Sequence, residues 1–187
     1  MSMLPATRRF TVQEYYRMAT AGILSEDDRV ELIDGEIVQM SPIGSRHAAC
    51  VKRLNQLFSG QVGGLALVLV QDPVRLDEHS EPEPDLALIT PRADYYAAAH
   101  PGPADVLLIV EVADTSAGYD RTVKATLYAR AGIRQFWLVD LEREQVEVLR
   151  GPTADGYRTV HTYRRGDRLT ADALPHMEIA VDAILGE

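Results

Sequence analysis

The stretch DVLLIVEV (105–112) constrains the fold most, because it is the most apolar part of the chain and resembles no surface segment. A run of this kind is typical of a β-strand that other elements cover on both faces. It is followed by YDRTVKATLYARAG (119–132), which has helical character and ends near a glycine, and then by the strand-like RQFWLVD (134–140). We therefore expect a strand–helix–strand unit in the middle of the chain, with 105–112 at the centre of a sheet.

The segments before this unit show three other patterns. FTVQEYYRMATAG (10–22) combines a capping threonine, a glutamate three residues later and a closing glycine, which indicates a short helix. RVELIDGEIVQM (29–40) holds two apolar runs around an Asp-Gly pair, which predicts a β-hairpin. SRHAACVKRLNQLFSG (45–60) places its apolar residues at helical spacing.

The other apolar runs are short. Those expected to form strands are LALVLV (65–70), PVRL (73–76), DLALIT (85–90), QVEVLR (145–150) and YRTVHTY (157–163), and a short helix is expected near VDAIL (181–185). Residues 91–104 are expected to form a loop with a helical turn. The pattern is mixed, with an antiparallel start that includes an N-terminal β-hairpin and a strand–helix–strand unit in the middle, which predicts an α+β fold (mixed α/β).

Composition limits the classes of protein to which the chain can belong. Its 187 residues suit one domain, and 46% hydrophobic with 25% charged residues is typical of a globular protein. No apolar run is long enough to span a membrane and no secretion signal is visible, so we expect a cytoplasmic protein with no membrane partner. One cysteine, Cys50, excludes a disulfide framework within the chain and a cysteine-rich zinc site.

The formal net charge of −9 argues against a surface that holds nucleic acid by general attraction for phosphate. Such a total still allows a local basic patch, or carboxylates gathered around a metal ion. Among the 19 basic residues only Lys52 and Lys124 are lysines. A lysine in a chain that otherwise uses arginine can be one that the chemistry requires.

Two carboxylates stand at the borders of expected strands. Asp85 opens the run DLALIT, and Glu111 lies near the end of the central strand after mostly aliphatic residues. A carboxylate in such surroundings is costly to bury unless a partner compensates its charge. The alternative for Glu111 is a solvent-exposed strand end, since ADTSAG (113–118) has the composition of a loop.

Lys124 shares one face of its expected helix with Leu127, Tyr128 and Ala131, at positions i, i+3, i+4 and i+7. Because the rest of that face is apolar, we expect the ammonium to turn back over the sheet toward the two acids. The alternative is a surface pair with Asp120, which stabilises little. We expect replacement of Lys124 by alanine to leave the fold nearly intact.

Two carboxylates and a lysine suit a hard cation such as Mg²⁺ or Mn²⁺, which prefers oxygen ligands. A metal of this kind polarises a phosphoryl oxygen and lowers the pKa of a bound water. The lysine can position that water or neutralise charge that develops on the phosphate.

The order Pro-Asp, then a glutamate at the end of a hydrophobic strand, then a lysine resembles the PD-(D/E)XK nuclease superfamily. More narrowly, the chain resembles the Uma family of restriction endonucleases. The matching stretches are VELIDGEIVQMSPIGSRH (30–47), EPDLALI (83–89) and DVLLIVEVADTSAGYDRTVKATLYARAGIRQFWLVD (105–140). Each stretch is weakly specific by itself, and their order and the length of the third make the resemblance strong.

The resemblance implies a single restriction-endonuclease-like domain over residues 1–187, with a mixed central β-sheet flanked by helices. Within it, the nuclease core is expected at about 10–150 and a C-terminal β-extension at about 151–187.

The resemblance also implies a set of site residues. Asp85, Glu111 and the backbone carbonyl of Val112 are the implied ligands of Mg²⁺ or Mn²⁺, and Asp85, Glu111 and Lys124 are the implied catalytic residues. The lysine of the superfamily motif normally stands two residues after the acid, where this chain has Ala113. In the family it is displaced to the following helix, which matches Lys124.

Two further candidates lie in the matched stretches. Superfamily members often carry an additional acid on an early helix or strand, so Glu31 is a candidate outer metal ligand. Its place on the hairpin leaves two possibilities open, the wall of a cleft and plain exposure to solvent. His47 stands at the start of its helix and is a candidate for contact with substrate phosphate. A solvent-facing or helix-capping histidine is the alternative.

These features predict a metal-dependent endonuclease that hydrolyses nucleic-acid phosphodiester bonds, with DNA as the expected substrate, by means of a metal-activated water. We expect a homodimer, because cutting both strands of a duplex needs two active sites. The alternative is a catalytically silent domain of the same fold that binds nucleic acid or another ligand. We also expect the hairpin at 30–40 and the loop at 91–104 to border the cleft.

Overall fold

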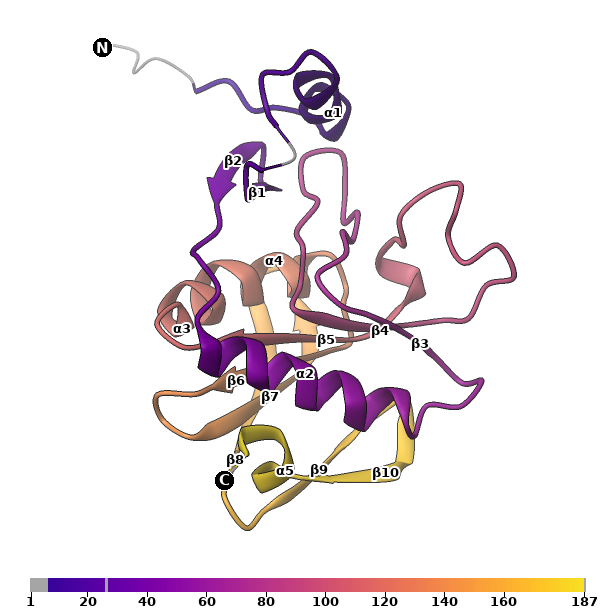
Figure 1. The fold of residues 1–187 in the computed structure, drawn as a ribbon, viewed down its shortest axis with the longest axis vertical. Helices are drawn as coiled ribbons and strands as arrows, with labels where there is room; N and C mark the ends of the chain where they lie inside the picture. The colour runs from indigo at the N-terminus through magenta and orange to yellow at the C-terminus, as the bar shows by residue number, and fades with distance from the viewer. Residues whose placement is uncertain (1–6, 26, 187) are drawn as a thin grey trace.

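The computed structural model describes residues 7–25 and 27–186. Its centre is a six-stranded sheet in the order β3-β4-β5-β6-β7-β8 (Figure 1). Only the pair β5–β6 is parallel in this sheet, which is therefore mixed, as expected. The strands are β3 (Leu67–Leu69), β4 (Leu86–Ile89), β5 (Val106–Ala113), β6 (Gln135–Asp140), β7 (Gln145–Thr153) and β8 (Gly156–Arg164).

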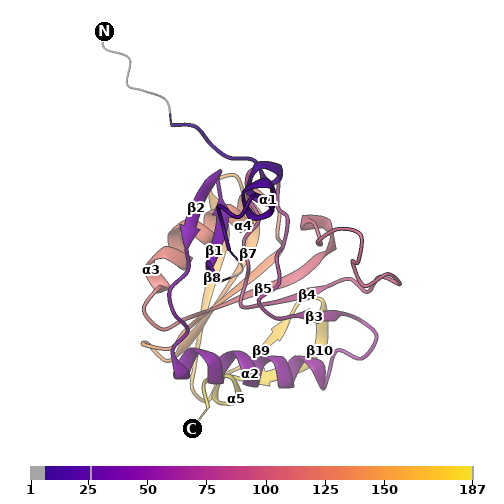
Figure 2. The same cartoon turned by 45° about the horizontal axis from the view of Figure 1, so that its top comes forward.

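Helices cover both faces of this sheet, as Figures 1 and 2 show. The long helix α2 (Ser45–Ser59) packs on one face together with the C-terminal elements. The connection that contains α3 (Ala117–Tyr119) and α4 (Ala125–Arg130) packs on the other. The strands β4, β5 and β6 are thus buried on both sides, as the apolar sequence of the central strand requires.

The side chains of β5 alternate between these two layers. Leu108 and Val110 belong to the hydrophobic core beneath α2, whereas Ile109 and Ala113 belong to the core beneath α4. This period of two follows from the pleat of a strand. It assigns Glu111, which lies between Val110 and Val112 in the sequence, to the face that α4 covers.

The N-terminal elements form as the sequence predicts. The helix α1 (Val12–Thr20) begins with a capping box between Thr11 and Glu14. The strands β1 (Val30–Ile33) and β2 (Glu36–Gln39) form an antiparallel hairpin. Its turn residues Asp34 and Gly35 both have positive φ, at 48° and 78°, which is the conformation that an Asp-Gly pair favours.

The connection between β5 and β6 is helical, but it begins at Ala117 and is not uniform. Between α3 and α4 the chain makes a π-helical turn, η2 (Asp120–Lys124), in which the N–H of Ala125 bonds to the carbonyl of Asp120. Such wide turns alter the direction of nearby side chains and are frequent at functional sites. The helical period used for 119–132 did not predict this turn.

One expected strand is absent. The stretch PVRL (73–76) forms no strand, although Val74 and Leu76 are buried. Their N–H groups bond to the carbonyls of Pro82 and Ser80, over 2.9 and 3.0 Å. These partners lie only a few residues further along the chain. The segment therefore forms its backbone hydrogen bonds locally and does not join the sheet.

The C-terminal part does not divide from the core near residue 150. The strand β7 continues to Thr153, and β8 pairs with it as the last strand of the central sheet. The strands β9 (Arg168–Ala171) and β10 (Leu174–Ala180) then form a second antiparallel pair. The apolar runs did not single out these two strands, although they lie within the expected C-terminal β-extension. The helix α5 (Val181–Leu185) is where a short helix was expected.

A short 3₁₀ turn, η1 (Pro103–Asp105), precedes β5. Within residues 7–25 and 27–186, no helix has both the length and the apolar character that crossing a membrane requires.

Candidate active site

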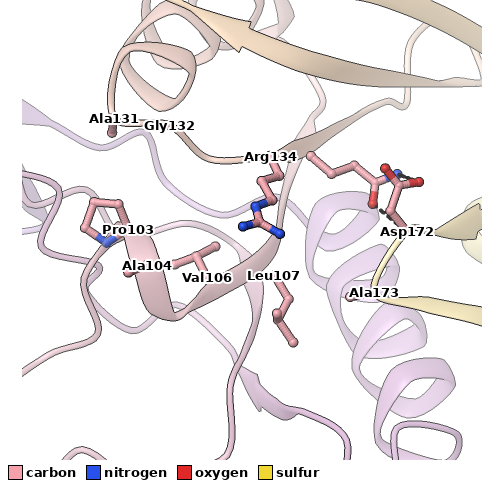
Figure 3. Close-up of a pocket in the computed structure, with 10 residues that line it drawn as sticks. Pro103, Ala104, Val106, Leu107, Ala131, Gly132, Arg134, Asp172 and Ala173 are labelled. Carbon is pink, nitrogen blue, oxygen red and sulfur yellow. Dashed lines mark hydrogen bonds between the residues drawn. The ribbon is translucent and has the colours of Figure 1, made fainter.

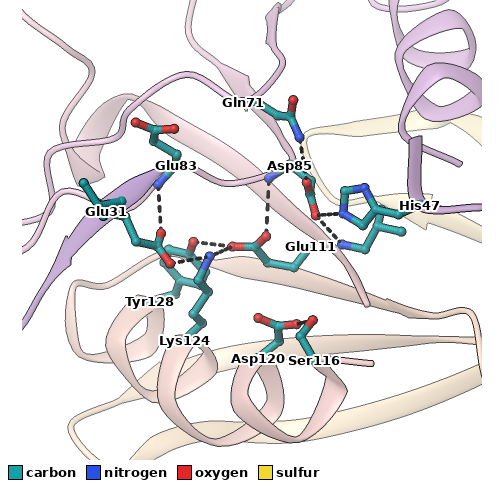
Figure 4. A network of polar contacts seen from close by, with 12 residues as sticks. Glu31, His47, Gln71, Glu83, Asp85, Glu111, Ser116, Asp120, Lys124 and Tyr128 are labelled. Atoms are coloured by element: carbon teal, nitrogen blue, oxygen red, sulfur yellow. Dashed lines mark hydrogen bonds and ion pairs between the residues drawn. The ribbon is translucent and has the colours of Figure 1, made fainter. Parts of the chain in front are cut away.

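Asp85 lies at the entrance to β4 and is 9% exposed. The N–H of Val112 donates to its Oδ2 over 2.9 Å, and the side-chain amide of Gln71 donates to its Oδ1 over 3.3 Å. Nε2 of His47 lies 2.9 Å from the same Oδ2 (Figure 4). The acid that opens this strand therefore has partners on three segments, which offset the cost of its burial.

Glu111 is 3% exposed and receives three hydrogen bonds. Its Oε1 accepts from the Lys124 ammonium over 3.0 Å and from the Tyr128 hydroxyl over 2.7 Å. Its Oε2 accepts from the N–H of Asp85 over 3.3 Å. The alternative of a solvent-exposed strand end is therefore wrong.

Lys124 turns back over the sheet, as expected from its helix face. Its Nζ lies 3.0 Å from Oε1 of Glu111 and 3.2 Å from Oε1 of Glu31. Asp120 instead accepts a hydrogen bond from the hydroxyl of Ser116, over 2.6 Å. Since Lys124 is only 7% exposed, its ammonium forms a buried ion cluster and not a surface pair.

Strand register brings the two acids together. In the antiparallel pair of β4 and β5, Leu86 stands opposite Val110. One step further along the pair, Asp85 meets Glu111, and residues opposite one another project from the same face of a sheet. The helical connection covers this face, so the lysine that it carries lies above the acids.

The charges in this cluster depend on one another. Burial raises the pKa of the Glu111 carboxyl, against the attraction of the nearby Lys124 ammonium. Burial would lower the pKa of Lys124, but Glu111 and Glu31 outweigh it and raise that pKa. If Glu111 were neutral, the positive charge of Lys124 would lose the carboxylate that stabilises it most. The hydrogen bonds favour the ion pair, because all the partners of Glu111 in the described part of the chain are donors.

His47 is half-buried and extends from the first turn of α2. Its hydrogen bond with Asp85 raises the pKa of the imidazole, while burial opposes this change. The other ring nitrogen, Nδ1, is buried and has no hydrogen-bond partner among residues 7–25 and 27–186. The structure thus excludes a helix-capping role for this side chain, since α2 has no side-chain cap, and brings it beside the acid pair.

All six residues singled out for the site line one cleft of about 490 Å³: Glu31, His47, Asp85, Glu111, Val112 and Lys124. The hairpin contributes to its wall through Val38 and Gln39, as expected. The loop at 91–104 does not, and that expectation is wrong. Antiparallel pairing puts the connection between β4 and β5 at the end of the strands opposite Asp85 and Glu111.

A larger cavity, of about 740 Å³, lies at that opposite end (Figure 3). Pro103 and Ala104 from the end of the loop line it, together with Arg134 and Asp172. None of the residues singled out for the site contributes to it. Its size therefore says nothing about the chemistry of the carboxylate cluster.

The expected metal ligands offer a consistent set of donors. Asp85 and Glu111 provide carboxylate oxygens and Val112 a backbone carbonyl, which are the donors that Mg²⁺ and Mn²⁺ prefer. Among the residues that the structure describes, no three His, Cys, Asp or Glu side chains gather as a metal site by themselves. The carbonyl of Val112 would then supply the third protein donor, and Mg²⁺ commonly completes its shell with water.

Three contributors to the site were missed in the sequence. Tyr128 belongs to the helix face that it shares with Lys124 and that the sequence analysis treats as apolar, so a role for its hydroxyl at the site was not predicted. Gln71, with φ 56°, and Glu83, whose N–H donates to Oε2 of Glu31 over 3.2 Å, lie in loop segments. The spacing of Lys124 and Tyr128 at i, i+4 was the one signal that pointed to any of them.

The chain resembles one solved structure in its fold and matches the model of one protein family. The chain is similar to a crystal structure described as "a putative nuclease belonging to DUF820" from Anabaena variabilis, with a TM-score of 0.72 at 16% identity over 94% of this chain and 97% of that chain. At this identity the likeness establishes a shared fold. No curated protein matches the chain. The model of the Uma2 family, described as "Putative restriction endonuclease", matches residues 12–182, and the chain therefore belongs to this family.

Proposed function

We propose that this protein is a metal-dependent endonuclease that hydrolyses phosphodiester bonds in DNA. The family and the fold support a nuclease in general terms. The observation that carries the proposal is the convergence of Asp85, Glu111 and Lys124 in one cleft, with the ammonium 3.0 Å from the Glu111 carboxylate.

Restriction-endonuclease-like families generally depend on divalent metal ions. Asp85, Glu111 and the carbonyl of Val112 would hold Mg²⁺ or Mn²⁺, which when bound supplies Lewis-acid polarisation of a phosphoryl oxygen and a lowered pKa of a bound water. The cleft is rich in carboxylates, and a cation there offsets their mutual repulsion.

The protein's own groups have separate tasks in this proposal. Lys124 keeps its proton, because two carboxylates raise its pKa, and offers a fixed positive charge to a phosphate that enters the cleft. Tyr128 and Lys124 together orient the Glu111 carboxylate. His47 orients Asp85, and it is a second candidate for contact with phosphate.

The substrate and the assembly are also part of the proposal. A net charge of −9 leaves little general attraction for a duplex, so phosphate contacts should concentrate at the cleft. Arg29, which is exposed and lines the cleft, is suited to such a contact. We propose a homodimer, since two active sites are needed to cut both strands.

One observation favours a second candidate, a catalytically silent domain that binds nucleic acid. The ammonium of Lys124 is held between Glu111 and Glu31, so it is already neutralised by protein carboxylates. In this alternative the cluster has only a structural role, and the cleft binds without cleaving.

Supercoiled plasmid incubated with the protein and Mg²⁺ or Mn²⁺ tests the proposal. We expect nicked and linear products with the wild type, none with Asp85→Asn, and wild-type cleavage with Asp155→Asn, which changes an exposed acid in the β7–β8 turn. A wild-type protein that shifts DNA in a binding assay but leaves it intact with either metal would support the silent domain instead.

A further inference from the structure

Glu31 was a candidate metal ligand, but its contacts assign it another task. Its carboxylate is 3% exposed, and the protein uses both of its oxygens. Oε1 lies 3.2 Å from Nζ of Lys124, and Oε2 accepts the N–H of Glu83 over 3.2 Å. One side chain on β1 therefore links the π-helical turn that carries Lys124 to the segment that leads into β4.

The strand that carries Glu31 is firmly held. The N–H of Glu81 donates to the carbonyl of Leu32 over 2.8 Å, which forms an isolated bridge between β1 and the segment before β4. On the other side of Glu31, the hydroxyl of Tyr15 donates to the carbonyl of Val30 over 2.9 Å. Because the residues before and after it are anchored, the Glu31 carboxylate has a defined place in the cleft wall.

The lysine needs such a partner. A lysine side chain is long and flexible, and its ammonium is a point charge with no preferred fork geometry. With Glu111 as its sole partner, Nζ could swing around one carboxylate oxygen. Glu31 on the other side restricts it to a position between two acids, as Figure 4 shows.

We propose that Glu31 is a positioning residue that holds the Lys124 ammonium beside Glu111, and that it does not ligate the metal. The catalytic meaning of this role rests on the proposed function, whereas the contact itself does not. A divalent ion on Oε1 of Glu31 would sit against the Lys124 ammonium, which lies 3.2 Å from this oxygen, and like charges at such a distance repel strongly.

The small number of lysines makes the proposal directly measurable. Because Lys52 and Lys124 are the only lysines, lysine-selective ¹⁵N labelling yields two side-chain signals, and Lys52→Arg identifies the one from Lys124. Glu31→Gln keeps the shape of the side chain and removes its charge. Glu81→Gln is the matched control, because Glu81 is equally buried at 3% and its carboxylate accepts a hydrogen bond from the hydroxyl of Tyr16.

We expect Glu31→Gln to shift the Lys124 signal in the absence of metal, and Glu81→Gln to leave it in place. Calorimetry with Mg²⁺ should show binding retained in Glu31→Gln and lost in Asp85→Asn. An unmoved Lys124 signal in Glu31→Gln, or loss of Mg²⁺ binding equal to that of Asp85→Asn, would overturn the proposal.

If the wild type binds no Mg²⁺, the proposed function fails and the lysine signal alone decides the contact. A melting curve separates these outcomes from unfolding. Should Glu31→Gln fail to fold, Glu31→Asp provides the second measurement, since it keeps the charge but shortens the reach to Nζ. The same shift of the Lys124 signal is then expected, and its absence contradicts the role.

Discussion

The ammonium of Lys124 lies 3.0 Å from Oε1 of Glu111, although the two residues are 13 positions apart in the chain. One belongs to the π-helical turn and the other to the central strand, so the crossover between β5 and β6 folds back over the strand that it leaves. This arrangement explains how a lysine outside the usual motif position can reach the acids of the cleft.

We predict that Lys124→Ala destabilises the protein, in contrast to the expectation from helix propensity. Removing the cation leaves the buried carboxylates of Glu111 and Glu31 without their shared partner, which typically costs about 3–5 kcal/mol. Helix propensity is a minor term here, because alanine differs from lysine by only a few tenths of a kcal/mol at a helical position.

The destabilisation should shrink as the pH falls, because the unpaired carboxyls can then take up protons. Urea unfolding at about pH 8 and about pH 5.5 measures the free energy of unfolding under both conditions. Lys52→Ala, at an exposed position of α2, is the control. A Lys124→Ala variant as stable as the wild type at the higher pH would show that the ion cluster contributes nothing to the fold.

Tyr128→Phe should weaken metal binding without changing the ligands. The lost hydroxyl donates to Oε1 of Glu111 over 2.7 Å, and loss of a group that orients a ligand typically lowers metal affinity about 10–100-fold. Tyr157→Phe removes a hydroxyl that donates to the carbonyl of Ile133 over 2.9 Å, outside the cleft. Calorimetry with Mn²⁺ should show weaker binding in the first variant only. Equal affinities in both would contradict a role for Tyr128 at the site.

His47 should make stability depend on pH near neutrality. The hydrogen bond with Asp85 raises the pKa of the folded imidazole above the unfolded value, which is about 6.5. The stabilisation is therefore complete below about 6.5 and is lost as the pH rises through the folded pKa.

His47→Gln should remove this component, whereas His176→Gln, at an exposed position of β10, should retain it. Free energies of unfolding measured across the neutral range for both variants and the wild type provide the test. Parallel curves for the wild type and His47→Gln would mean that the imidazole gains no proton affinity from Asp85.

Cys50 should resist thiol reagents in the native protein. Burial raises the pKa of its thiol to about 12, and Sγ donates to the carbonyl of Ile184 over 3.4 Å beneath α5. The thiolate is the reactive form, so a colorimetric disulfide reagent should label Cys50 slowly until urea unfolds the chain. Rapid labelling without urea would indicate that α5 detaches readily from α2.

The sequence by itself determined the local helices and turns, and it singled out Asp85 and Glu111 as the acids of the site. The Asp-Gly turn and the capping box at Thr11 depend on residues close in the chain, so their signals are complete in a short window. The burial of β5 follows from its aliphatic run, and the alternation of a strand then decides which of its residues share a face with Glu111.

Only the tertiary structure decided what meets at the cleft. The register of β4 against β5 brings Asp85 to Glu111, and the same antiparallel pairing moves the loop at 91–104 to the far end of the sheet. Because a long connection and not a tight turn joins β4 to β5, their register is set by how the buried faces of the two strands pack. The π-helical turn and the anchoring of β1, which direct Lys124 toward Glu111 and Glu31, likewise depend on contacts between segments far apart in the chain.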